Sequence, residues 1–170
     1  MFGGVSAGAC REAVSHIMTT HDAQVREIRA DELDPLLELY RHLHGKDDPL
    51  PAREQVCTVW EAMLASPMMK CFVIERDGRL VSSCVLTIIP NLTRGARPYG
   101  LIENVVTHAD CRQQGLGTMV LRHALEAAWR AGCYKVMLLT GRKDPGVHRF
   151  YQGAGFEGGE KTGYIARPGV

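Results

Sequence analysis

Two glycines, Gly115 and Gly117, stand two positions apart shortly after Arg112, in a pattern that could bind an anion. An apolar, β-branched run at 102–107 precedes them and predicts a strand. Apolar residues after them recur at helical spacing as far as Ala131. Glycines between a strand and a helix permit a tight turn, and the free N–H groups of the first helical turn favour phosphate. The pattern predicts either an anion-binding loop or a plain strand-to-helix turn.

Two further side chains have the chemistry to move a proton. Tyr151 carries a phenol that can donate a hydrogen bond or a proton, although its place between Phe150 and Phe156 is equally typical of aromatic packing. Glu103 is a carboxylate in an otherwise apolar strand, two residues before Val105. Such a carboxylate either faces solvent, pairs with a cation in the core, or points into a cavity.

Taken together, two motifs resemble those of the GNAT superfamily of N-acetyltransferases. Arg112, Gly115 and Gly117 match its pyrophosphate-loop pattern Arg/Gln-x-x-Gly-x-Gly/Ala, and residues 150–156 are similar to its Phe-Tyr-x-x-x-Gly-Phe ending. The resemblance covers roughly residue 25 to the end. It implies an α/β (α+β) fold, a GNAT-like acyl-CoA acyltransferase fold. Such a fold has a mixed, mostly antiparallel twisted sheet, one parallel βαβ crossover and helices on both faces.

The resemblance also implies acetyl-CoA as co-substrate, and no metal. Pantetheine would pair with the backbone of the central strand, and the pyrophosphate would take N–H groups of the glycine loop. The cofactor-binding residues implied in this way are Val105, Val106, Thr107, Arg112, Gln113, Gln114, Gly115, Leu116, Gly117, Thr118 and Asp144. Asp144 departs from the asparagine that many members have there, because aspartate cannot donate as an amide does.

Within this resemblance Tyr151 is the expected general acid for the departing thiolate, and Glu103 the expected base for the attacking amine. Glu103 would act directly or through water, and His108 is an alternative base. Arg142, Lys143 and Arg149 either bind an anion of the substrate or cofactor, or are ordinary surface charges.

Residues 102–106 and 132–135 are similar to the glucosamine-6-phosphate N-acetyltransferase branch, which suggests a small amine acceptor and a homodimer. We expect an enzyme that moves acetyl from acetyl-CoA to a primary amine of a small molecule (amino sugar, amino acid or polyamine type). The amine would attack directly in a ternary complex. One alternative is acetylation of a protein N-terminus or lysine, with a groove at 45–51 and 91–98. Another is a non-catalytic acyl-CoA-binding regulatory module.

The elements that position these residues follow from local signals. Asp31 is a plausible N-cap for a first helix. Asp77-Gly78 between apolar runs predicts a hairpin. Strands are expected at 25–29, 71–75, 80–89, 99–107 and 134–140, helices after 31 and over 52–65, 115–131 and 144–153, and a loop at 91–98. A final short strand is expected at 164–166, shared with a partner chain.

Composition sets the remaining expectations. A net charge of +1 in 170 residues gives no argument for nucleic acid or an anionic membrane. No apolar run reaches the roughly 20 residues of a membrane helix. Six cysteines without C-x-x-C spacing favour free thiols in the cytoplasm over a zinc site. We expect a flexible extension at 1–24 and a single domain at 25–170.

Overall fold

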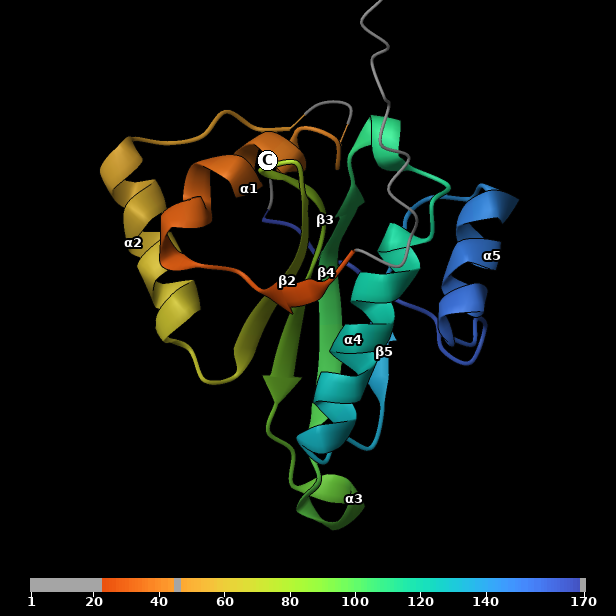
Figure 1. Cartoon of the computed structure of the whole chain (residues 1–170). Helices are drawn as coiled ribbons and strands as arrows, with labels where there is room; N and C mark the ends of the chain where they lie inside the picture. Colours follow the sequence, from red (N-terminus) through yellow and green to blue (C-terminus); the bar gives the residue numbers. More distant parts are fainter. Residues whose placement is uncertain (1–22, 45–46, 169–170) are drawn as a thin grey trace, which may run out of the picture.

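A five-stranded sheet forms the centre of the fold, in the computed structural model that describes residues 23–44 and 47–168 (Figure 1). Its strands, in spatial order, are β1 (Val25–Glu27), β2 (Met69–Arg76), β3 (Arg79–Ile89), β4 (Tyr99–Thr107) and β5 (Val136–Leu138). Neighbouring strands are antiparallel except β4 and β5, which run parallel. The predicted mixed sheet with one parallel crossover is therefore confirmed.

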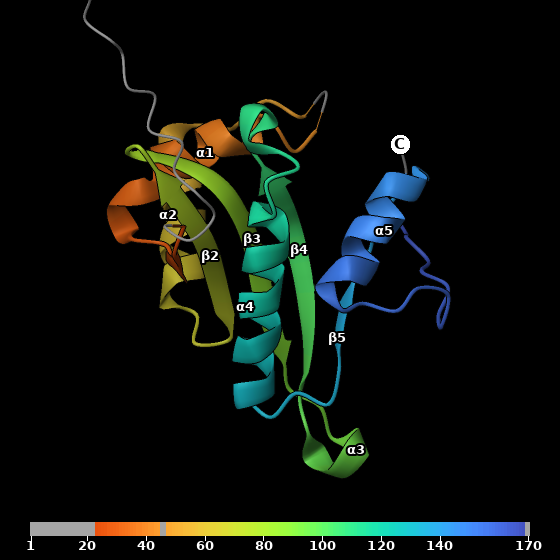
Figure 2. The ribbon, with the colours of Figure 1, turned by 45° about the vertical axis from the view of Figure 1, so that its right-hand side comes forward.

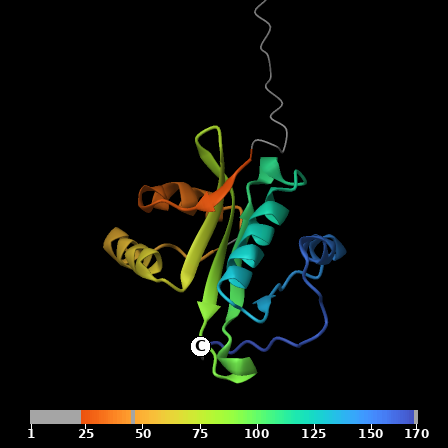
Figure 3. The same ribbon diagram turned by 60° about the horizontal axis from the view of Figure 1, so that its bottom comes forward.

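Helices cover both faces of this sheet, as Figure 3 shows most clearly. They are α1 (Leu33–Tyr40), α2 (Arg53–Ala65), α4 (Leu116–Arg130) and α5 (Pro145–Ala154), with short helical segments η2 (Ala30–Glu32), α3 (Thr93–Ala96) and η3 (Ala109–Cys111). α1 and α2 lie against one face of the sheet, and α4 and α5 lie on the opposite side of the sheet (Figure 3).

Strand β2 shows why both faces are covered. Its side chains alternate between the two faces, and four consecutive residues are buried. Phe72 and Ile74 join a core with α4, whereas Cys71 and Val73 join a second core with α1 and α2. A strand that is apolar on both faces needs a helical layer on each side to remove those side chains from water.

A β-bulge interrupts the pairing of β4 with β3. Ser83 of β3 pairs with Val106 and Val85 pairs with Glu103, so β4 has an extra residue between them. Asn104 sits there with φ 53°, in the left-handed region. Pairing between β4 and β5 ends at Ile102 opposite Leu138, and the two strands then diverge (Figure 2). The divergence leaves β4 without a strand partner on this side over the described residues.

The predicted N-cap at Asp31 is wrong. Asp31 lies inside η2, and the neighbouring Glu32 makes the contact instead: its carboxylate accepts from the backbone N–H of Arg29 at 2.7 Å. Glu32 is buried and also forms an ion pair with Arg26 at 2.6 Å. Hydrogen bonds from Arg26 lower the pKa of Glu32, since they stabilise its charged form. Because Arg26 pairs with Glu32, it is Glu32 rather than Asp31 whose carboxylate caps the turn.

The loop expected at 91–98 is present. The four-residue segment α3 within it has positive φ at Arg94, Gly95 and Ala96, which makes it a tight turn rather than a regular helix. The strand expected at 164–166 does not form in the single chain. Tyr164 and Ile165 are 91% and 69% exposed in an irregular tail. β5 is an edge strand of the sheet, but the tail does not pair with it in this single chain. The extension predicted at 1–24 falls, except for residues 23 and 24, outside the described residues.

Candidate active site

A pocket of about 900 Å³ opens where β4 and β5 diverge. Its walls are the segment after α1, β4 beyond Leu101, the start of α4, the loop after β5, and α5. Most of the predicted site residues line it, and they come from four separate elements. They are Glu103, Val105, Val106, Thr107, Arg112, Gln113, Gly115, Leu116, Gly117, Thr118, Asp144 and Tyr151. Gln114 is the predicted residue that does not line it.

The two glycines at the start of α4 serve different purposes. Gly115 is the N-cap with φ 79°, a conformation that residues with a Cβ adopt at a cost. Gly117 is needed for close approach, because a Cβ there would lie 3.0 Å from Phe150 Cζ and 3.2 Å from Thr107 Oγ1. No side chain caps this helix. Its first N–H groups are therefore available to a ligand in the pocket.

Two polar residues of the loop are already engaged within the protein. Arg112 donates to the carbonyl oxygens of Thr107 at 3.2 Å and His42 at 3.1 Å. The side chain of Gln114 accepts from Arg76 at 2.7 Å and donates to the carbonyl of Asp110 at 3.2 Å. These contacts hold the loop to β2, β4 and α1. The side chains of Arg112 and Gln114 thus shape the loop, and its main chain faces the pocket.

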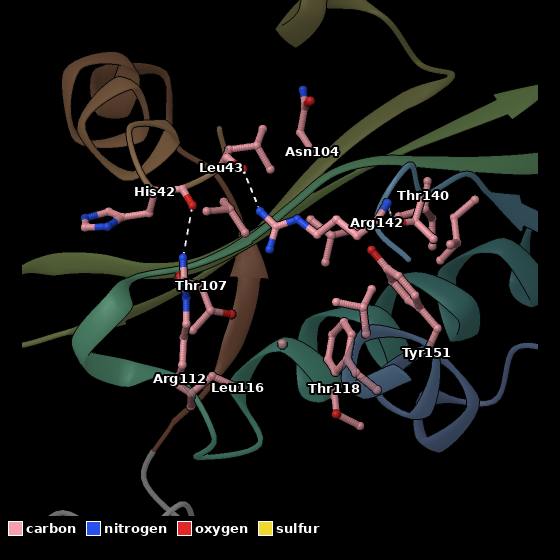
Figure 4. A pocket seen from close by; sticks show the side chains of 18 of the residues that line it. His42, Leu43, Asn104, Thr107, Arg112, Leu116, Thr118, Thr140, Arg142 and Tyr151 are labelled. Atoms are coloured by element: carbon pink, nitrogen blue, oxygen red, sulfur yellow. Dashed lines mark hydrogen bonds between the residues drawn. The ribbon is translucent and has the colours of Figure 1, made fainter. Parts of the chain in front are cut away.

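Tyr151 is the phenol in this pocket. It packs on Phe150 with ring centroids 5.0 Å apart and on Phe156 with centroids 6.3 Å apart, so the aromatic packing is real. Its hydroxyl nevertheless points into the pocket toward Arg142 (Figure 4). Burial raises the pKa of Tyr151, nearby Arg142 lowers it in part, and Glu103 raises it further. The hydroxyl is thus protonated at neutral pH.

Of the possible bases, Glu103 lines the pocket and His108 does not. The Nδ1 atom of His108 accepts from the backbone N–H of Asp110 at 3.3 Å, and its ring packs on that of His42 at a tilt of 52°, with 4.0 Å between centroids. Burial lowers the pKa of His108 first, and His42 and Arg79 lower it further. A neutral His108 could accept a proton, but it lies outside the pocket. Glu103, which lines the pocket, is therefore the better-placed base.

Asp144 is used as a helix cap. Its carboxylate accepts from the backbone N–H of Gly146 at 2.6 Å, and Pro145 occupies the first turn of α5, as the sequence predicts. The segment that follows α1 also reaches the site. His42, Leu43 and His44 line the pocket, and Arg142 from the loop after β5 donates to the Leu43 carbonyl at 3.1 Å (Figure 4). Helical periodicity gives no signal for such a contact between distant segments.

Other expected features lie elsewhere or are not seen in the described residues. The segment 91–98 lines no part of the pocket, and α3 lies at the opposite end of β4 (Figure 1). Across residues 23–44 and 47–168, no three His, Cys, Asp or Glu side chains group as metal ligands would. No helix in these ranges is long and apolar enough to cross a membrane.

Comparison with known proteins identifies the family. The model of the family described as "Acetyltransferase (GNAT) family" matches residues 32–156. The chain belongs to this family. It is an acyltransferase, an N-acetyltransferase of the GNAT fold. A glucosamine 6-phosphate N-acetyltransferase of Trypanosoma brucei brucei is 34% identical to this GNAT protein over 140 residues, 82% of this chain and 92% of the relative.

Solved structures agree on the fold of this GNAT protein. A putative acetyltransferase from Agrobacterium tumefaciens is 48% identical, with TM-score 0.79 over 85% of this chain and 99% of that one. The glucosamine-6-phosphate N-acetyltransferase of Arabidopsis thaliana is 21% identical, with TM-score 0.74 over 86% of this chain and 97% of that one. At that identity the likeness supports the fold alone.

Proposed function

We propose that this GNAT protein transfers the acetyl group of acetyl-CoA to a primary amine of a small molecule, by direct attack in a ternary complex. One observation carries the proposal. A single pocket joins the uncapped start of α4, the unpaired side of β4 and the hydroxyl of Tyr151. These are the three parts that an acyl-CoA, its thioester and its leaving group require.

The cofactor is assigned to the main chain of two elements. The pyrophosphate would accept from the N–H groups of Leu116, Gly117 and Thr118, with the positive end of the α4 dipole behind them. The pantetheine would extend β4 along its unpaired side, where a β5 partner is missing beyond Ile102. A backbone N–H near Val106 would then polarise the thioester carbonyl.

The chemistry needs one base and one hydrogen-bond donor. Glu103, directly or through water, takes a proton from the ammonium so that the amine nitrogen can attack the thioester carbon. As the C–N bond forms, the nitrogen loses its second proton to water, the C–S bond breaks and the sulfur leaves as a thiolate. Tyr151 donates to that sulfur. A thiol has a pKa of about 8.5 and a phenol about 10. Because burial raises the pKa of Tyr151 further, it stabilises the thiolate mainly by hydrogen bonding rather than by full proton transfer.

The acceptor is proposed from the relatives. Proteins named glucosamine 6-phosphate N-acetyltransferase recur among them, at 34% and 35% identity. An amino sugar is therefore the first acceptor class to test, ahead of amino acids and polyamines. We also propose that the protein is a homodimer acting in the cytoplasm.

Calorimetric titration with acetyl-CoA, then with free coenzyme A, tests the cofactor assignment. Thiol release with glucosamine 6-phosphate, glucosamine, an amino acid and spermidine then tests the acceptor. Micromolar cofactor binding and release dependent on one of these amines support the proposal. Binding with no small-amine turnover, together with acetylation of a peptide, would replace it with a protein acceptor.

A further inference from the structure

We propose that Arg142 is the receptor for an anionic group on the acceptor, so that the enzyme selects amines that also carry a phosphate or carboxylate. The inference rests on the proposed function and narrows its substrate class. Arg142 leaves the loop after β5, crosses the pocket and ends at Leu43, in the segment after α1 (Figure 4).

The charges of the pocket wall leave Arg142 as the cation available to a ligand. Arg112 is held by two carbonyls, and the carboxylate of Asp144 caps α5. Glu103 is assigned to the amine. Among the described residues, no carboxylate lies within ion-pair distance of Arg142. A guanidinium in a pocket without an acidic partner fits a ligand that brings the negative charge.

The present contact of Arg142 is one that an anion can displace. The guanidinium donates through one nitrogen to a neutral carbonyl, that of Leu43, although it has five N–H donors. A hydrogen bond to an ionised oxygen is roughly twice as strong as one between neutral groups, and phosphate or carboxylate can take two at once. The loop itself is held by a hydrogen bond from the backbone N–H of Arg142 to Thr140 Oγ1 at 3.2 Å, which fixes the point from which the Arg142 side chain enters the pocket.

The location of Arg142 assigns the anion to the acceptor rather than to the cofactor. The uncapped start of α4, where phosphate is favoured, begins after Gly115 on a different wall. Arg142 and Glu103 line the same pocket as Tyr151, whose hydroxyl, at which the acyl group is expected, points toward Arg142 (Figure 4). An amine held at Glu103 would turn the rest of the molecule toward Arg142. The neighbouring Lys143 and Arg149 do not line the pocket.

Steady-state kinetics with three acceptors test the inference: glucosamine 6-phosphate and glucosaminic acid, which carry an anionic group, and glucosamine, which carries none. The wild type should prefer one of the two anionic amines. Arg142→Gln should raise KM for that amine about 10- to 100-fold, and Arg142→Lys should restore part of the loss. KM for glucosamine and the Kd of acetyl-CoA should not change. Lys143→Gln, on the same loop, is the matched control and should behave as wild type.

Each other outcome has a defined meaning. Equal use of glucosamine and both anionic amines by the wild type would overturn the inference while leaving the proposed function intact. A weaker Kd for acetyl-CoA in Arg142→Gln would also overturn it, since the guanidinium would then belong to the cofactor. Failure of the wild type to acetylate any small amine would overturn the proposed function, and this inference with it.

Discussion

At the scale of single residues, Tyr151 presents the sharpest test of the proposed chemistry. Tyr151→Phe removes the hydroxyl but keeps the ring that packs on Phe150 and Phe156. We expect kcat to fall about 100-fold, in the usual range for losing one hydrogen-bond donor to a developing negative charge, with no change in the Kd of acetyl-CoA or in Tm. Tyr164→Phe, at an exposed tyrosine, is the control. A variant with unchanged kcat would leave Tyr151 as a packing residue.

Glu103 is tested through pH. A primary amine is mostly protonated at pH 7, so a base matters most there and less as the pH rises toward the amine pKa. Glu103→Gln should lower kcat/KM about 100-fold at pH 7, and the loss should shrink steadily toward pH 9.5. Rates at five pH values decide this. If His108→Gln shows that pattern and Glu103→Gln does not, the base is His108.

The same pH series examines Tyr151 from the alkaline side. Burial raises the pKa of its phenol above the usual value of about 10, so the donating form persists through pH 9.5. We therefore expect no alkaline decline in wild-type kcat up to that pH. A decline near pH 8, absent from Tyr151→Phe, would show that the hydroxyl ionises early and that its surroundings are more polar than this structure indicates.

At the scale of elements, the loop before α4 couples the cofactor site to α5. Alanine at Gly117 would force its Cβ against Phe150, beside Tyr151, and we expect a loss of about 1–3 kcal/mol in stability together with a lower kcat. Alanine at Gly115 meets no atom within 4 Å but must adopt φ 79°, which costs about 1–2 kcal/mol. That variant should weaken acetyl-CoA binding more than kcat.

Thermal melts and calorimetric titrations of the two alanine variants separate these effects. If Gly117→Ala changes only the Kd of acetyl-CoA and leaves kcat intact, α5 does not depend on this contact. If Gly115→Ala binds acetyl-CoA as tightly as wild type, the left-handed cap is not what shapes the anion site.

Elements with strong local signals were predictable from sequence. The hairpin turn at Asp77, the helix cap at Asp144 and the glycine loop each depend on chemistry within a few residues, and each appears in the structure. The bulge at Asn104 and the contact between Arg142 and Leu43 depend on segments that meet only after folding. No periodicity encodes either feature. The cap misassigned to Asp31 is similar, because Arg26 on β1 decides in favour of Glu32.

At the scale of the whole molecule, the end of the chain argues for a partner. The tail passes beside β5, since a Cβ at Gly163 would lie 3.0 Å from Leu139 Cδ2. Leu139, Tyr164 and Ile165 are 56%, 91% and 69% exposed, next to an edge strand of three residues. Edge strands and exposed apolar side chains favour pairing with another chain. A second copy would give the tail the strand partner that one chain lacks.

Light scattering after gel filtration measures this directly. The wild type should have twice the 18.8 kDa of one chain, and Tyr164→Ser combined with Ile165→Ser should shift it toward the monomer. Leu92→Ser is the control, because Leu92 is 94% exposed beside α3 at the far end of the molecule (Figure 1). A dimer that survives the tail substitutions but not Leu92→Ser would place the interface at α3, and a wild-type monomer would show that the exposed tail has another use.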